Sequence, residues 1–238
     1  VLAVGLGGWL YLSSYYTEHF DAQARQRLER DRDLFVAANQ LNAVKFLRTV
    51  MARSGASEIE GVFATVTDEE IAELRETYGM PEGVETDNEE NAENATPPPA
   101  TDEELRLILR RRAHQECQAF RAFLSQEQAG GRTPELIAIT DGNGVVISRD
   151  VDPNAQPVGV NLSKQYSSVQ RALRGNAVRD FWYWNEFLLD VAIAPIHREG
   201  SVVGSVLVGY DISNGVAQAD RDMFGEDVAY LFRQGEEW

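Results

Sequence analysis

Two consecutive segments in the second half of the chain, 187–196 and 202–211, are apolar at almost every position. Successive side chains of a β-strand point to opposite faces of its sheet, so each of these segments would have two apolar faces. Such strands are stable in the centre of a sheet that is covered on both sides. The chain therefore needs a sheet with these two strands near its centre, and enough helix and loop to cover both faces.

The rest of the chain supplies the other strands and the covering elements. Short alternating runs between turn signals predict three more strands, 135–140, 145–149 and 178–184. A short helix is expected at 163–173, and capping boxes predict helices that begin at Thr67 and Thr101. We expect the helix from Thr101 to cover one face of the sheet, and the short helix with its loops to cover the other. The fold class is therefore α+β.

A long helix is predicted over 17–52, where apolar residues recur at helical spacing. The residues of this stripe are Phe20, Leu28, Phe35, Ala38, Leu41, Val44, Leu47 and Met51. Gly55 follows the last of them and is expected to end the helix. The pattern has no break at its N-terminal side, so we expect one helix to run on from the preceding residues.

Residues 1–16 carry no charge, and Trp9, Tyr11, Tyr15 and Tyr16 gather toward the end of this segment. As a helix it would span about 24 Å, a little less than the roughly 30 Å of a bilayer core. Aromatic residues are typical of the membrane interface. We interpret 1–16 as an N-terminally incomplete transmembrane anchor, with a signal-peptide core and a buried soluble helix as alternatives. No later segment is apolar for long enough, so the rest would lie on one side of the membrane, outside the cytoplasm.

The chain of 238 residues is 43% hydrophobic and has a formal net charge of −16. That hydrophobic fraction supports a folded core, and the charge argues against nucleic acid as a partner. Nine acidic residues and no basic one lie in 81–104, together with three consecutive prolines. We expect this segment to be a linker without regular structure.

The order of a long helix, two strands, a helix and three strands resembles the Cache-type, PAS-like sensor domain of bacterial membrane receptors. The segments that carry the resemblance are IAITDGNGVVISR, PVGVNLSKQYSSVQRALRGN and DVAIAPIHREGSVVGSVLVGYDIS. The resemblance implies a five-stranded antiparallel sheet and an extracytoplasmic ligand-binding role. The full set of residues that bind ligands in the family cannot be placed on this chain, so the resemblance does not identify a ligand.

These patterns divide the chain into five parts. They are an anchor at 1–16, a long helix and short helical segment at 17–80, the acidic linker at 81–104, the Cache-like domain at 105–215, and the start of a further, truncated segment at 216–238.

Aromatic residues on one predicted strand suggest where a ligand would bind. Trp182 and Trp184 share a face, and pockets for small molecules are commonly lined by aromatic rings with a few polar groups. Asp190 lies in an apolar strand and needs a partner, either Arg179 or Lys164 or an amino group of a ligand. The candidate ligand-binding residues are Tyr166, Arg171, Trp182, Trp184 and Asp190. The aromatic rings could instead be part of the core.

No pattern typical of catalysis, of a resident cofactor or of a metal site is present. Asp150 to Asn154 resembles the start of a calcium loop but lacks its glycine and its twelfth acidic residue, which favours a turn. His114 and Cys117 share a helix face without further ligands nearby. Two functions therefore remain. The first is a sensory ligand-binding domain anchored in the bacterial inner membrane. The second is a ligand-free accessory subunit of a larger respiratory or photosynthetic membrane complex, with a homodimer as another candidate assembly.

Overall fold

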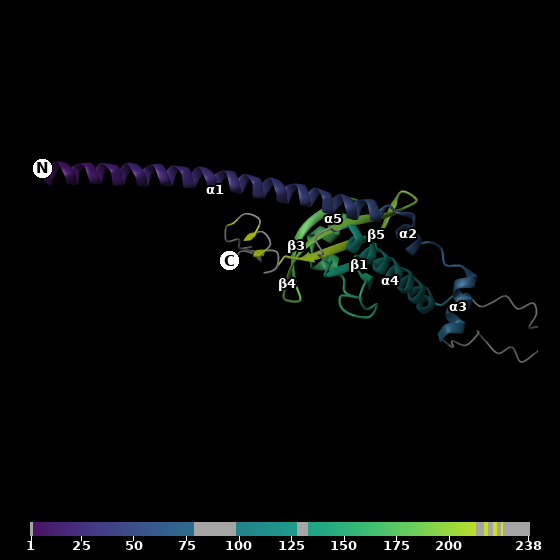
Figure 1. Cartoon of the computed structure of the whole chain (residues 1–238). Helices are drawn as coiled ribbons and strands as arrows, with labels where there is room; N and C mark the ends of the chain where they lie inside the picture. Colours follow the sequence, from purple (N-terminus) through teal and green to yellow (C-terminus); the bar gives the residue numbers. More distant parts are fainter. Residues whose placement is uncertain are drawn as a thin grey trace, which may run out of the picture.

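The fold contains the helices and strands that the sequence predicts, in the predicted order (Figure 1). This computed structural model describes residues 2–78, 99–127, 133–212, 217–218, 221–222 and 225. The elements are α1 (Leu2–Ser54), α2 (Ser57–Val62), α3 (Asp68–Tyr78), α4 (Asp102–Glu127), β1 (Leu136–Asp141), β2 (Val146–Arg149), the 3-10 turn η2 (Leu162–Lys164), α5 (Ser167–Leu173), β3 (Val178–Trp184), β4 (Phe187–Arg198) and β5 (Ser201–Asp211). Most of the predicted linker 81–104 and of the segment 216–238 lies outside the described residues, although the last three linker residues form the start of α4.

The five strands form one sheet in the order β2-β1-β5-β4-β3, and every neighbouring pair is antiparallel. Both strands with two apolar faces lie near the centre of the sheet, as expected: β5 is the middle strand, and β4 lies beside it. Both strands are buried over most of their length, which confirms the prediction that helices and loops cover both faces.

Different elements cover the two faces of the sheet. On one side, called here the helix face, Ile139, Ala192 and Val206 pack with residues of α1, α2 and α4 such as Val50 and Phe120. On the other side, the loop face, Leu189, Val191 and Leu207 pack under η2, α5 and the loop that precedes them. The helix from Thr101 and the short helix thus cover the faces predicted for them, and the C-terminal part of α1 adds to the helix face.

Helix α1 runs from Leu2 to Ser54, so residues 1–16 and 17–52 belong to one continuous helix from residue 2 onward. Its predicted apolar stripe does not pack as one surface: Leu47 packs against the core of the helix face, but Leu41, Val44 and Met51 are about half exposed. The helix has two separate apolar sides, one packed against the domain and one exposed. The spacing of apolar residues in the sequence does not distinguish these two sides. Within the described residues, none of the helices has an apolar stretch long enough to cross a bilayer.

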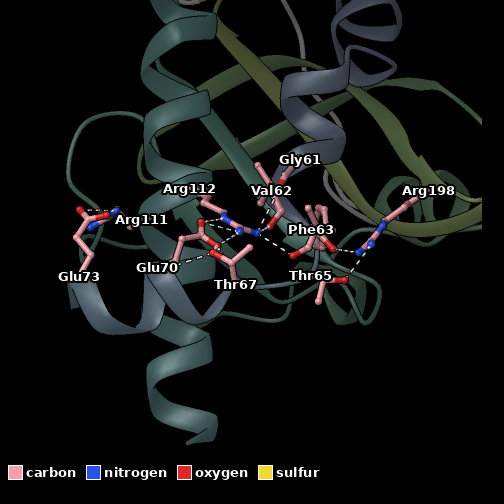
Figure 2. A network of polar contacts seen from close by, with 11 residues as sticks. Gly61, Val62, Phe63, Thr65, Thr67, Glu70, Glu73, Arg111, Arg112 and Arg198 are labelled. Carbon is pink, nitrogen blue, oxygen red and sulfur yellow. Dashed lines mark hydrogen bonds and ion pairs between the residues drawn. The ribbon is translucent and has the colours of Figure 1, made fainter. Parts of the chain in front are cut away.

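Two arginines hold the C-terminal end of α2 against the rest of the fold (Figure 2). Arg112 of α4 donates to the carbonyls of Gly61, Val62 and Ala64 and pairs with Glu70 of α3, with Nη2 2.5 Å from Oε2. Arg198, at the end of β4, donates to the Phe63 carbonyl. These arginines satisfy carbonyl groups that a helix leaves unpaired at its C-terminus. The end of α2 is thus tied to both α4 and the sheet.

A buried ion pair joins α3 to the start of α4. Arg75 Nε lies 2.6 Å from Glu104 Oε1, and the two side chains are 10% and 6% exposed. Glu104 also accepts from the backbone N–H of Thr101, as the predicted capping box requires. These contacts lower the pKa of Glu104 to about 2, chiefly through the hydrogen bond from Arg75.

We expect Glu104→Gln to destabilise the protein at neutral pH and to have progressively less effect in acid. The pKa of Glu104 is depressed in the folded state, so its stabilising contribution is complete above the ordinary glutamate pKa of about 4.3 and is lost as the pH falls toward about 2. Urea unfolding of the wild type and the variant at pH 7, 4 and 2.5 measures this difference. Glu103→Gln, at an exposed neighbour, is the control. A gap between wild type and Glu104→Gln that stays constant with pH would contradict the assignment.

Candidate ligand-binding site

Strand β3 directs the aromatic side chains of the predicted site to the loop face. Trp182 pairs with Leu189 of β4, and both belong to the cluster under α5. Trp184 and Asp180 are each two residues from Trp182 along β3, so their side chains point to the same face of the sheet as Trp182. Trp182 is 1% exposed, and its indole N–H donates to Ser168 Oγ at 3.1 Å and to Asp180 Oδ2 at 3.2 Å. The ring is therefore fixed in position by packing and by polar contacts at its edge.

Tyr166, directly before α5, stacks on this tryptophan. The two ring centroids lie 3.9 Å apart with an angle of 12° between the ring planes. The Tyr166 hydroxyl donates to the backbone carbonyl of Tyr183 at 3.3 Å. Burial, with a smaller contribution from the Asp180 carboxylate, raises the pKa of Tyr166, so its hydroxyl stays protonated at neutral pH. Tyr166 is thus a hydrogen-bond donor at the edge of the aromatic cluster.

Arg149, at the end of β2, supplies a cation to the same face. Its Cζ lies 5.7 Å from the ring centroid of Trp184, within the range of a cation–π contact. Nη1 donates to the Gln156 carbonyl at 2.7 Å and Nη2 to the Glu135 carbonyl at 3.2 Å. Nε is buried and has no hydrogen-bond partner among the described residues, although Asp150 Oδ1 lies 3.7 Å away. Because β2 and β3 are opposite edges of the sheet, this contact means that the sheet curls around the loop face.

Of the five residues predicted for the site, three come together and two lie elsewhere. Tyr166, Trp182 and Trp184 all pack in the loop-face cluster. Arg171 is exposed on α5, whose buried side chains are Ser168, Val169 and Ala172. Asp190 lies opposite Phe181 and Tyr210, on the helix face, and forms a two-pronged pair with Arg179 at 2.6 and 2.7 Å. Arg179 is one of the two partners expected for this carboxylate.

Arg149 was not among the site residues predicted from the sequence, and a β-bulge decides the face of the sheet on which it lies. The register between β1 and β2 shifts between Ile139 and Thr140, so that Val146 lies opposite Thr140 while Arg149 lies opposite Ala138. Strict alternation from Val146 would have placed Arg149 on the helix face. The shift moves it to the loop face, and only three-dimensional pairing reveals this.

The nearby polar residues on the helix face have structural partners. Asp150 is fully buried, forms an ion pair with Arg121 and accepts from the Ile137 N–H at 3.3 Å. Asp152 accepts from the Asn154 N–H at 2.8 Å, which is the turn that the sequence favoured over a calcium loop. His114 contacts the Arg149 carbonyl at 2.7 Å, and burial raises the pKa of the Cys117 thiol. The part of the chain that the structure describes holds no group of three or more potential metal ligands.

No protein-family model and no curated protein matches the sequence. Among solved structures, the sensor domain of the histidine kinase DctB from Vibrio cholerae matches with a TM-score of 0.47 and 12% identity, over 84% of this chain and 58% of that one. The DcuS sensor domain from Escherichia coli matches with a TM-score of 0.34 and 20% identity, over 46% of this chain and 81% of that one. The sensory domain of the Campylobacter jejuni chemoreceptor Tlp3, with isoleucine bound, matches with a TM-score of 0.34 and 9% identity, over 81% and 66%.

These three matched structures are sensor domains of bacterial receptors. At such identities the similarity concerns the fold alone. The chain spans little more than half the length of the DctB sensor domain.

Proposed function

We propose that this chain is an extracytoplasmic sensory domain that binds a small molecule on the loop face of its sheet. The observation that carries the proposal is Arg149, whose buried Nε–H has no hydrogen-bond partner among the described residues and whose guanidinium lies over Trp184. An unsatisfied buried donor costs free energy, and a ligand that accepts from it would recover that loss. A cation beside aromatic rings is also a common arrangement for fixing a small, partly polar ligand.

The elements that cover the loop face suit a site that opens to admit a ligand. They are a loop, the three-residue turn η2 and the seven-residue helix α5, whereas the helix face is covered by much longer helices. Segments with short, local contacts open more readily than long packed helices. The proposed binding residues are therefore Arg149, Tyr166 and Trp184, with Trp182 and Asp180 holding them in place.

A thermal-shift screen of the full chain against carboxylates, amino acids and amines tests the site. A compound present at one hundred times its Kd should stabilise the protein by about 2.7 kcal/mol. We expect Arg149→Gln to abolish the shift, and Arg171→Gln, at the exposed arginine on α5, to preserve it. A screen in which no compound stabilises the wild type would argue for the other function, a ligand-free accessory subunit of a membrane complex.

The proposal includes attachment to the bacterial inner membrane through residues 1–16, with the domain on the outer side. Its support is the absence of charge over these residues and the aromatic residues near their end. We expect deletion of residues 1–16 to move the protein from the membrane fraction to the soluble fraction. Firm membrane association after the deletion, measured by flotation in a density gradient, would contradict the anchor.

A further inference from the structure

The carboxylate of Asp150 lies between two arginines that approach it from opposite faces of the sheet. Arg121 reaches it from α4, on the helix face, and forms an ion pair with its Oδ2. Arg149 lies on the loop face, and its Nε is 3.7 Å from Asp150 Oδ1. The Asp150 side chain is fully buried, so its charge depends on partners within the protein.

The backbone of β1 and the guanidinium of Arg121 hold Asp150 in place. The Asp150 N–H donates to the Ile137 carbonyl at 3.1 Å, and Asp150 Oδ1 accepts from the Ile137 N–H at 3.3 Å. Arg121 directs both Nε and Nη2 at Oδ2. Hydrogen bonds between a guanidinium and a carboxylate are among the strong ones in proteins. Both carboxylate oxygens therefore have donors that do not come from Arg149.

Arg149 is also fixed in place, but its Nε–H has no acceptor. The side chain is 11% exposed, and Nη1 and Nη2 already donate to the carbonyls of Gln156 and Glu135. Nε has no hydrogen-bond partner among the described residues, and its 3.7 Å separation from Asp150 Oδ1 is too long for a hydrogen bond. A shift of about 0.5 Å would bring the two atoms into range. A buried donor thus stops just short of the acceptor that would satisfy it.

The attraction of Arg121 for the same carboxylate explains why this gap stays open. An unpaired buried donor costs free energy, so closing the gap would be favourable if nothing opposed it. Without Arg121, Arg149 would be the remaining ion-pair partner of Asp150 in the described part of the chain. A buried carboxylate that loses one cation is strongly driven toward another. Arg121 and Arg149 therefore compete for Asp150, and in this structure Arg121 holds it.

We propose that Arg121 is a positioning residue of the loop-face site: by holding Asp150, it leaves the Nε–H of Arg149 available to a ligand. That a ligand uses this N–H rests on the proposed function, whereas the competition for Asp150 rests only on the geometry of the three side chains. Arg121 itself belongs to the helix face and does not touch the ligand. Its substitution would therefore change binding from the opposite side of the sheet.

NMR of the isotope-labelled full chain in mild detergent tests the competition without any ligand. The Arg149 Nε–H signal is identified by its loss in Arg149→Gln. We expect Arg121→Gln to slow the exchange of this proton with water about tenfold or more, because it then pairs with the Asp150 carboxylate. Arg53→Gln, which breaks the part-buried pair with Glu116 of α4, is the control and should leave the exchange unchanged. Unchanged exchange in Arg121→Gln would overturn the proposal.

A second substitution at the same position keeps this test decisive if Arg121→Gln does not fold. Arg121→Lys retains the positive charge but replaces the planar guanidinium with a single ammonium group. It should hold Asp150 less firmly and slow the exchange of the Arg149 proton to a smaller extent. Exchange as fast as in the wild type would then count against the competition.

Binding of the compound that stabilises the wild type most in the thermal-shift screen tests the consequence for the site. Arg121→Gln should raise its Kd about tenfold or more, because the donor is then occupied. The double variant Arg121→Gln/Asp150→Asn removes the competing carboxylate as well, so the Kd should return close to the wild-type value. If Arg121 only supported the fold, the double variant would bind no better than the single one, and that result would overturn the proposal.

The two measurements separate this inference from the proposed function. A screen in which no compound stabilises the wild type would contradict ligand binding, and the exchange of the Arg149 proton would still decide whether Arg121 keeps Asp150 away from it. Conversely, a compound that binds through Arg149 with equal Kd in the wild type and Arg121→Gln would support the proposed function and refute the role of Arg121.

Discussion

Trp182→Ala is expected to lower the free energy of unfolding by about 3–5 kcal/mol, the usual range for removing a fully buried large aromatic residue. The indole is 1% exposed, stacks on Tyr166 and donates to Ser168 and Asp180. Its removal leaves a cavity in the loop-face core and removes the hydrogen bonds at its edge. Urea unfolding followed by circular dichroism measures the change.

The neighbouring Tyr183 provides the matched control for this prediction. Its side chain is 50% exposed and belongs to the other face of β3. Tyr183→Ala should change stability by no more than about 0.5 kcal/mol, as for most surface substitutions. Comparable losses in the two variants would show that Trp182 is not held in the core as described.

Gly204→Ala is expected to destabilise the protein by about 1–3 kcal/mol or more, through overpacking. A Cβ atom at this position would lie 2.2 Å from the Thr140 carbonyl oxygen and 2.7 Å from the Phe63 ring. The oxygen belongs to a paired strand, so it cannot move aside as a flexible side chain would. The sheet pairing, the contact with Phe63 or both must therefore shift.

A glycine in α2 gives the opposite expectation. A Cβ atom added at Gly61 would have no neighbouring atom within 4 Å, and alanine is the better helix former by roughly 0.5–1 kcal/mol. Gly61→Ala should therefore be neutral or stabilising in the same unfolding assay. A Gly204→Ala variant as stable as Gly61→Ala would contradict the close contact between the end of α2 and the sheet.

The fold could be predicted from the sequence because its signals are local. The two segments that became β4 and β5 are apolar on both faces, and this alone required a covered sheet with these strands near its centre. The capping boxes at Thr67 and Thr101 marked the starts of α3 and α4 to within one residue. Signals of this kind depend on neighbours within a few positions, so they can be read without knowledge of tertiary contacts.

The site was only partly predictable because it depends on contacts between distant segments. Alternation along one strand correctly placed Trp182 and Trp184 together, and Asp190 was correctly given Arg179 as one of two expected partners. The face on which Asp190 lies depends on its pairing with the neighbouring strands, and the orientation of Arg149 depends on a bulge and on the curl of the whole sheet. Neither is encoded in a short window of sequence.

The central claim is that a small molecule binds on the loop face through Arg149, and hydrogen exchange of the full chain tests it most directly. The measurement compares the protein alone with the protein saturated by the compound that raises its melting temperature most. We expect slower exchange in residues 144–166 and 178–184, with little change in α1 and α4, and loss of that protection in Arg149→Gln. Protection confined to the helix face, or protection of the loop face that persists in Arg149→Gln, would contradict the claim.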